Sequence, residues 1–378
     1  MARVIRLKLN DFRNLKSIEL FLSPGINLFV GANGSGKTSL LEALHVLGTG
    51  RSFRTTRFDP LIANDSDHFM IFAEVAETLG SAVKIGLKRN KKAGPPLLRL
   101  NEHSQNSWSQ VAASLPLQLI NSDSFSILEG GGKVRRRFLD WALFHVEQSY
   151  LSDWRDYRRV VSHRNTLLKQ KRFSLGTELD AWDAEMAVLG ETIHEHRLRL
   201  IEVFEPEFKS VIEKFLPRVQ IDFEYRSGWV DSDTSRLGEV LKLTRDRDIR
   251  YGMSLSGPHR GDFSLKTEGR SATDTLSRGQ TKMLIFALKL AMGNIIKNLK
   301  QPSSKQLVNR PIYMIDDLAA ELDEENSLKI INYLAESGDQ CIFTAISELA
   351  LKRVSELSEA SGKFHVEHGK ITSSPAMV

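Results

Sequence analysis

The stretch that decides the fold is Gly31-Ala32-Asn33-Gly34-Ser35-Gly36-Lys37-Thr38, which has the form G-x-x-x-x-G-K-[ST] of a phosphate-binding loop. An apolar run at Ile26–Val30 predicts a buried strand before it, and residues 39–47 predict a helix after it. The glycines let backbone N–H groups converge on a phosphate at the positive end of that helix. We expect Lys37 to bridge the β- and γ-phosphates and the Thr38 hydroxyl to bind Mg²⁺. The stretch therefore predicts a site for a nucleoside triphosphate with magnesium.

The second element is a pair of aspartates that ends the apolar run at residues 311–317 (PIYMIDD). It resembles a Walker B strand, in which Asp316 would hold Mg²⁺ through water and Asp317 would orient the attacking water. A carboxylate pair at the end of a parallel strand lies where an open α/β sheet places its ligand. An Asp-Asp turn after any core strand is the simpler explanation. Because the same chain contains a phosphate-binding loop, the active-site explanation of this pair is favoured over an ordinary turn.

The third element is LSRGQ at residues 276–280, which resembles the signature motif of ABC-type ATPases, with Arg278 where transporters usually have glycine. The motif opens a long apolar helix. In that family, Ser277 and Gly279 contact the γ-phosphate of ATP held by a second protomer. Residues 320–323 (AELD) match the D-loop, which lies across the same dimer interface. A serine N-cap on a core helix is the alternative for Ser277, and both roles can coexist.

Five more stretches extend the pattern along the chain: LNDFRNL at 9–15, GRSFR at 50–54, EGG at 129–131, RRRFLD at 135–140 and GPHR at 257–260. Together with the signature and the Asp316-Asp317 pair, they resemble the bacterial RecF family nearly end to end. The resemblance implies a recombination mediator related to the heads of SMC proteins. Such a protein binds double- and single-stranded DNA in an ATP-dependent way, dimerises on ATP, and works with RecR and RecO to load RecA.

The resemblance also assigns residues to the site. It implies that Arg13 and Asn14 line the ATP pocket beside the loop. It makes Arg51, Arg54, His259 and Arg260 candidates for contact with phosphate or DNA, whereas without the family a structural role is the simpler explanation for each.

Two departures from the general ABC pattern limit what the resemblance implies. Asp317 stands where transporters have glutamate, and its shorter side chain predicts slow hydrolysis. The strand at residues 340–344 is followed by no histidine where the ABC switch histidine would stand. The strand at Leu117–Ile120 ends at Asn121, near the place of the Q-loop glutamine. Either Gln118 or Asn121 can serve there, and either can be an ordinary polar residue.

Composition limits the alternatives independently. The chain has 378 residues, 41% of them hydrophobic, and can bury one large core or two modest ones. No apolar run approaches the roughly 18 to 20 residues that span a bilayer, and the N-terminus lacks a signal-peptide core. We therefore expect a cytoplasmic protein with no membrane contact. The single cysteine, Cys341, excludes an intrachain disulfide and reads as a core side chain.

Positive charge is concentrated in one segment, since residues 131–175 hold eleven Lys or Arg against four Asp or Glu, while the whole chain has a net charge of +5. An apolar stripe from Leu139 to Leu168, at spacings of three and four, predicts one long helix or a broken pair. We expect the basic residues, Arg164 among them, to lie largely on the remaining surface, where they could meet DNA phosphates. A solvated helix face is the alternative. The candidate DNA contacts are Arg135, Arg136, Arg137, Arg155, Arg158 and Arg159.

The order of elements predicts a discontinuous head. Residues 1–130 would form the first part of the ATPase head, 131–250 an inserted, mainly helical basic lobe, and 251–378 the second part of the head. The insertion is required because the loop and the Walker B strand must meet although they lie about 280 positions apart. The insertion shows no sustained heptads. The expected fold is an α/β P-loop ATPase head of the ABC/SMC type with an inserted helical lobe and no long coiled coil.

We therefore expect an ATP-gated dimer on DNA with slow hydrolysis as its switch. Three alternatives are weighed against it. An ABC transporter ATPase subunit would share the ATP motifs, but its usual histidine and glutamate are missing here. A phosphate-loop metabolic kinase would leave the LSRGQ motif without a purpose. An SMC-like protein that binds ATP without turnover is the third.

Overall fold

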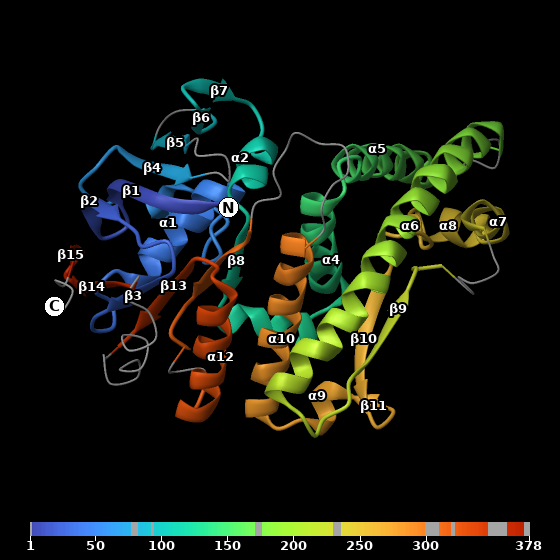
Figure 1. Ribbon diagram of the computed structural model, residues 1–378. Helices are drawn as coiled ribbons and strands as arrows, with labels where there is room; N and C mark the ends of the chain where they lie inside the picture. The colour runs from blue at the N-terminus through green and yellow to red at the C-terminus, as the bar shows by residue number, and fades with distance from the viewer. Residues whose placement is uncertain are drawn as a thin grey trace. The chain divides into compact units, whose positions relative to one another are not determined.

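The computed structural model describes residues 2–76, 82–91, 94–170, 176–229, 236–298, 310–318, 322–346 and 361–373. Two units divide the chain (Figure 1): Met1–Ser124 with Ile296–Val378, and Phe125–Ile295. The first division falls close to the boundary expected at residue 130. The second differs from the boundary expected at 250, because the signature and most of its helix belong to the second unit. The helix packs within that unit, so the sequence order of the ATP motifs did not indicate where the unit ends.

The first unit contains a six-stranded sheet with the strand order β15-β14-β3-β13-β12-β8. Strands β3, β13, β12 and β8 pair in parallel, and β14 also runs parallel to β3. Every residue of β3, β12 and β13 is buried, as expected for parallel strands covered on both faces. The strands are β3 (Ile26–Val30), β8 (Leu117–Ile120), β12 (Ile312–Ile315), β13 (Cys341–Ala345), β14 (Gly362–Glu367) and β15 (Lys370–Ser373).

A second sheet in this unit is antiparallel, in the order β2-β1-β4-β5-β6-β7. Buried and more exposed residues alternate along β4, which is typical of a sheet with one face on the core. Its strands are β1 (Arg3–Phe12), β2 (Leu15–Phe21), β4 (His68–Ala76), β5 (Ala82–Asn90), β6 (Leu97–Leu100) and β7 (His103–Gln105).

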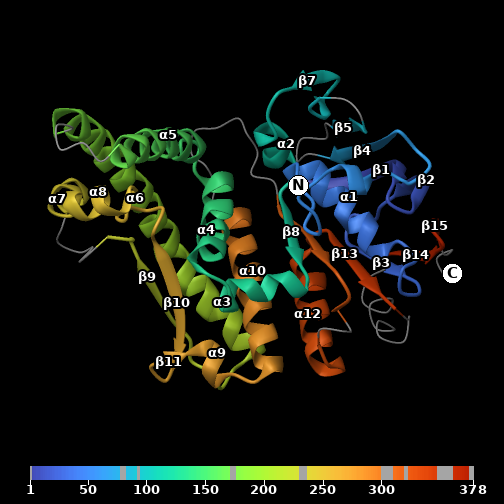
Figure 2. The same cartoon turned by 180° about the vertical axis from the view of Figure 1, so that it is seen from behind.

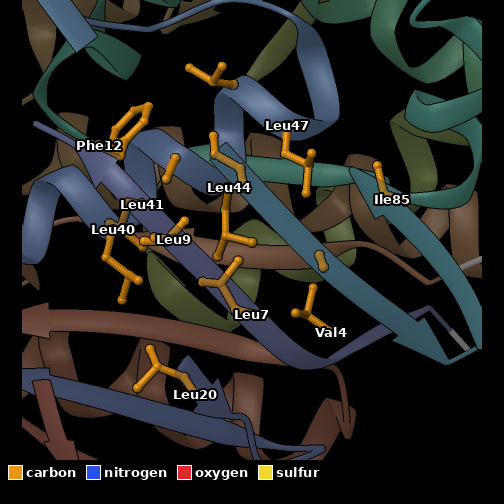
Figure 3. Close-up of a cluster of buried hydrophobic side chains, with 14 of the residues drawn as sticks. Val4, Leu7, Leu9, Phe12, Leu20, Leu40, Leu41, Leu44, Leu47 and Ile85 are labelled. Carbon is orange, nitrogen blue, oxygen red and sulfur yellow. The ribbon is translucent and has the colours of Figure 1, made fainter. Parts of the chain in front are cut away.

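Helix α1 (Lys37–Thr49) shares one hydrophobic core with both sheets. Leu40, Leu44 and Leu47 lie with Leu7 of β1 in the cluster that Figure 3 shows, and Met314 of β12 belongs to the same core. Packing on several faces explains why the helix is apolar around most of its circumference. The start of α1 is therefore held by both sheets.

Further helices of the first unit are η1 (Asp59–Leu61), α2 (Ser109–Ser114), η2 (Ser122–Phe125) and α12 (Glu324–Ser337). Cys341 is fully buried in β13, and burial raises the pKa of its thiol. The prediction that this residue is a core side chain is confirmed.

The second unit is mainly helical, with a small sheet in the order β11-β10-β9 (Figure 2). The predicted stripe gives the broken pair, α4 and α5, and its residues Leu139, Leu143, Tyr157 and Leu168 are buried. The helices are α3 (Ser126–Glu129), α4 (Gly132–Val146), α5 (Tyr150–Lys169), α6 (Gly176–Phe215), α7 (Leu237–Leu243), α8 (Arg245–Tyr251), α9 (Ala272–Thr275) and α10 (Arg278–Asn298). The strands are β9 (Asp222–Arg226), β10 (Asp262–Thr267) and β11 (Arg270–Ser271). Across the described ranges, no helix combines the length and apolar character that a membrane span requires.

Arg164 departs from the expectation that the basic residues of this segment lie on the surface. Its side chain is fully buried, and it donates from Nε to Asp183 at 2.6 Å and from Nη1 to Asp248 at 2.7 Å. A buried guanidinium requires such partners. The prediction was wrong for Arg164, which joins α5 to α6 and α8.

Candidate nucleotide-binding site

The phosphate-binding loop connects β3 to α1 as predicted. Gly31 continues the sheet, since its N–H donates to the Ala345 carbonyl at 3.2 Å. Gly34 and Gly36 have φ angles of 77° and 124°, in the region that favours glycine. A Cβ at Gly31 would lie 2.0 Å from the Val366 carbonyl oxygen. The tight path of the loop therefore depends on its glycines.

The loop and the Walker B strand meet at the carboxyl edge of the parallel sheet. The Thr38 hydroxyl donates to Asp316 Oδ1 at 3.1 Å. Thr344 of β13 donates to the same oxygen at 2.7 Å, and its Oγ1 accepts from the Asp317 N–H at 2.9 Å. Asp317 has a φ of 52°, a left-handed conformation in which Asp and Asn are enriched. The hydroxyl and carboxylate oxygens of Thr38 and Asp316 are the hard ligands that Mg²⁺ prefers.

The Lys37 side chain lies inside the loop that it follows. Its Nζ donates to the carbonyls of Gly31 at 2.7 Å and Ala32 at 2.9 Å. Burial lowers the pKa of Lys37, while the carboxylates of Asp317 and Asp316 act to raise it. The nearby carboxylates thus favour a positive charge where a phosphate would bind.

An open cavity of about 1020 Å³ surrounds these groups. Arg13 and Asn14 line this cavity, as the resemblance implied. The Asn14 amide donates to the Ser35 carbonyl at 3.1 Å. Of the two Q-loop candidates, Asn121 lines the cavity, whereas Gln118 is buried in β8 opposite Tyr313. The lining comprises Arg13, Asn14, Lys16, Asn33, Gly34, Gly36, Lys37, Thr38, Ser39, Arg54, Pro60, Ile62, Ala63, Asn64, Asp65, Asn121, Ser122, Asp316 and Asp317.

Glu42 is a candidate functional residue that the sequence analysis did not predict. Glu42 of α1 is fully buried and accepts two hydrogen bonds from Arg13, at 2.9 and 2.8 Å. The signal was present, because a glutamate interrupts the otherwise apolar stretch Leu40–Leu44 of the helix. Charged side chains are seldom buried without a partner.

The signature lies in the second unit and is described by itself. Ser277 and Gln280 form a capping box: the Gln280 N–H donates to Ser277 Oγ at 3.3 Å, and the Ser277 N–H donates to Gln280 Oε1 at 2.9 Å. The alternative role of Ser277 as an N-cap is confirmed. A Cβ at Gly279 would meet nothing within 4 Å. Of the predicted D-loop at 320–323, residues 320 and 321 lie outside the described residues.

The predicted DNA contacts divide into two groups. Arg135 donates to both Asp262 oxygens, at 2.7 and 2.9 Å, and the hydrogen bonds to Asp262 raise its pKa. Arg136 donates to the Gly261 carbonyl at 2.7 Å. These two side chains hold α4 to the segment that begins β10. The other four are exposed: Arg137 on α4, and Arg155, Arg158 and Arg159 on α5.

The GPHR stretch is built into the fold of the second unit. His259 Nδ1 lies 2.7 Å from the Tyr157 hydroxyl, and its Nε2 lies 3.0 Å from the Ser254 carbonyl oxygen. Burial lowers the pKa of His259 to about 4, so the ring is neutral at pH 7. A neutral ring with both nitrogens engaged contributes to packing more readily than to phosphate binding.

The comparisons with known proteins cover the whole architecture. The family model described as "RecF/RecN/SMC N terminal domain" matches residues 3–372. "DNA replication and repair protein RecF" of Cellvibrio japonicus is 37% identical over 97% of this chain and 98% of that protein. The protein of the same name from Azotobacter vinelandii is 38% identical, over 97% of each chain.

Solved structures agree on the fold. The structure titled "Structure of the recombination mediator protein RecF-ATP in RecFOR pathway" superposes with a TM-score of 0.83, at 24% identity over 99% of this chain and 98% of that one. An Smc head bound to the C-winged helix domain of ScpA gives 0.62, at 14% identity over 98% and 97%. The expected ABC/SMC-type ATPase head is therefore confirmed. The chain belongs to the RecF family of DNA replication and repair proteins.

Proposed function

We propose that this chain is an ATP-dependent DNA-binding protein of recombinational repair and replication, which dimerises around ATP and uses slow hydrolysis as a switch. The observation that carries the proposal is the hydrogen bond between Thr38 and Asp316, which both line the cavity. It unites the two halves of a magnesium-nucleotide site in a chain of the RecF family.

The residues of the first unit fit ATP with Mg²⁺. The loop amides and Lys37 would bind the phosphates, since the first N–H groups of a helix have no acceptor within their own helix. Thr38 and Asp316 would hold Mg²⁺, which neutralises charge on the β- and γ-phosphates when bound. Asp317 would orient the attacking water. Its carboxylate reaches less far than that of a glutamate, which supports weak ATPase activity. Stimulation of this activity by DNA is part of the proposal.

A dimer is supported by the signature. Ser277 is exposed, and its capping box fixes the first turn of α10. Nothing within 4 Å would obstruct a Cβ at Gly279, so the residues around it do not require a glycine. A close-approaching phosphate from a second protomer would require one. Ser277 and Gly279 are therefore proposed to complete the partner's ATP site.

DNA is the proposed macromolecular ligand, both double-stranded and single-stranded. Arg137, Arg155, Arg158 and Arg159 would meet its phosphates with release of counterions. The RecF structure named above is titled as part of a RecFOR pathway. We extend that relation to this chain: RecR and RecO would be its partners in loading RecA, in the cytoplasm. A transporter ATPase subunit or a metabolic kinase is disfavoured by the full-length match to RecF proteins.

The test compares the wild type with Ser277→Asp, because aspartate preserves the N-cap and places negative charge against the partner's γ-phosphate. Ser271→Asp, at the N-cap position of α9, is the matched control. We would measure binding of a fluorescent duplex and molecular mass by light scattering, with and without ATP. The wild type and the control should dimerise on DNA with ATP, and Ser277→Asp should remain monomeric. An ATP response identical in all three proteins would refute completion of the site by a second protomer.

A further inference from the structure

Glu42 is an acidic residue at the centre of the arginines that line the ATP cavity. It has 0% exposure in α1, five positions after Lys37. Its Oε2 accepts from Arg13 Nε at 2.9 Å and from Arg54 Nη1 at 3.5 Å. Its Oε1 accepts from Arg13 Nη2 at 2.8 Å and from the Ser52 hydroxyl. One buried carboxylate therefore joins three side chains from two separate segments of the chain.

The two arginines are held to different degrees. Arg13 makes a two-pronged contact with Glu42, and its Nη1 donates to the Pro60 carbonyl at 2.9 Å. Such a fork fixes the plane and direction of a guanidinium. Arg54 reaches Glu42 only at 3.5 Å, and its side chain is 48% exposed. Arg54 is thus the cation that can turn from the carboxylate toward a ligand at small cost.

Glu42 also orders the backbone that carries Arg54. The Ser52 hydroxyl, which donates to Glu42, accepts from the N–H of Arg54 at 2.9 Å and from the N–H of Thr55 at 3.0 Å. Loss of the carboxylate would release the hydroxyl that holds this turn. The position of Arg54 therefore depends on Glu42 through its side chain and through its main chain.

We propose that Glu42 is a positioning residue for the phosphates of ATP. It fixes Arg13 beside the cavity and holds the turn at 52–55 so that Arg54 can exchange its long contact with Glu42 for a β- or γ-phosphate. The inference deepens the proposed function and rests on it. A second explanation makes Glu42 only the counter-ion that keeps α1 folded, and it predicts equal loss of affinity for every nucleotide.

The test uses Glu42→Gln, which keeps the shape of the side chain but accepts through one oxygen only. Equilibrium binding of ATP and of AMP would be measured for this variant, for Arg54→Ala and for the double variant. We expect Glu42→Gln to weaken ATP binding about 10-fold and AMP binding less than about twofold, because AMP lacks the distal phosphates. In the Arg54→Ala background the loss should shrink at least about threefold, as expected for coupled side chains.

A readout without nucleotide separates positioning from general loss of structure. Amide hydrogen exchange at Arg54 and Thr55 should be faster in Glu42→Gln, while exchange in the strands of the first unit stays unchanged. Ser52→Ala is a milder variant that leaves the fork with Arg13 in place. It should speed the same two amides and weaken ATP binding about threefold. Glu19→Gln, on β2, is the control for charge.

Each outcome decides the matter. Equal losses for ATP and AMP, or an undiminished loss in the Arg54→Ala background, would overturn the positioning role and leave Glu42 a structural counter-ion. If Glu42→Gln does not fold, Ser52→Ala decides: unchanged ATP affinity refutes the proposal. If the wild type itself fails to bind ATP, the proposed function fails first, and the inference falls with it.

Discussion

The Thr38 hydroxyl lies 3.1 Å from the Asp316 carboxylate, although 278 positions separate the two residues. Neither residue alone makes a magnesium site, and their meeting requires β13 to lie between β3 and β12. The fold therefore places the two proposed oxygen ligands together at the end of the phosphate-binding loop.

Asp316→Asn should remove the magnesium dependence of ATP binding. The amide keeps an oxygen for Thr38 and Thr344 but lacks the charge that attracts the cation. We expect ATP affinity in Mg²⁺ to fall about 10-fold, toward the value measured with a chelator. Asp65→Asn is the control, because Asp65 also lines the cavity but pairs with Lys16. Retention of the full magnesium effect in Asp316→Asn would refute the assignment.

Asp317→Asn should abolish hydrolysis and preserve ATP binding. Asparagine tolerates the left-handed backbone at this position, so the variant is expected to fold. Loss of a general base or water-orienting group typically costs about 10²- to 10⁴-fold in rate. Phosphate release and light scattering with ATP would be followed together, and the variant should accumulate as the ATP-bound dimer. Wild-type turnover in Asp317→Asn would exclude this residue from the reaction.

Arg164→Met should strongly destabilise the second unit. The substitution leaves Asp183 and Asp248 buried and without the Arg164 guanidinium, for which the expected loss is about 3–5 kcal/mol. Arg158→Met removes an exposed arginine of the same helix and should change stability by less than about 0.5 kcal/mol. Urea unfolding followed by far-UV circular dichroism measures both. Similar midpoints for the two variants would contradict the buried ion pairs.

The exposed arginines of α5 should contribute to DNA binding. Replacing Arg155, Arg158 and Arg159 together by alanine should weaken binding of a duplex and reduce the salt dependence of its affinity by about 0.9 per lost phosphate contact. Fluorescence anisotropy over a range of salt concentrations gives both quantities. A matched triple variant takes exposed basic residues of α7 and α8 in the same unit: Lys242, Arg247 and Arg250. An equal effect in this control would mean that general charge, and not α5, sets affinity.

Buried His259 predicts a loss of stability in acid. Burial lowers the pKa of this ring from 6.5 to about 4, so the unfolded chain takes up the proton first. The stabilisation that this ring contributes is complete above pH 6.5 and declines as the pH falls toward 4, by up to about 1.4 kcal/mol per pH unit. Urea unfolding at pH 7.5 and pH 5 should show a smaller acid loss in His259→Gln than in the wild type. Replacing exposed His163 by glutamine should leave the difference unchanged.

Local patterns predicted the elements that depend on neighbouring residues. Each of these elements is encoded by residues close together in the chain, and each appears in the structure. They are the glycines at 31, 34 and 36, the Asp316-Asp317 pair, and the apolar stripe on α4 and α5. The serine cap of α10 could be predicted for the same reason.

Contacts between residues far apart in the chain could not be predicted from the sequence. Arg164 resembles its exposed neighbours until Asp248, 84 positions away, is seen beside it. The arginine partners of Glu42, Arg13 and Arg54, likewise lie outside its own helix. The boundary at Ile295 was missed because a helix that begins with an ATP motif packs within the other unit. In each case the deciding contact joins residues that no local period connects.

Thr344 gives one hydroxyl two tasks, since it donates to the Asp316 carboxylate and accepts from the Asp317 amide. A shift of β13 against β12 would therefore disturb both the proposed metal ligand and the proposed water-orienting residue. The positions of Asp316 and Asp317 are thus coupled through one side chain of the neighbouring strand. Thr344→Val would remove both hydrogen bonds while keeping the shape of the side chain, so the two aspartates would lose this shared contact.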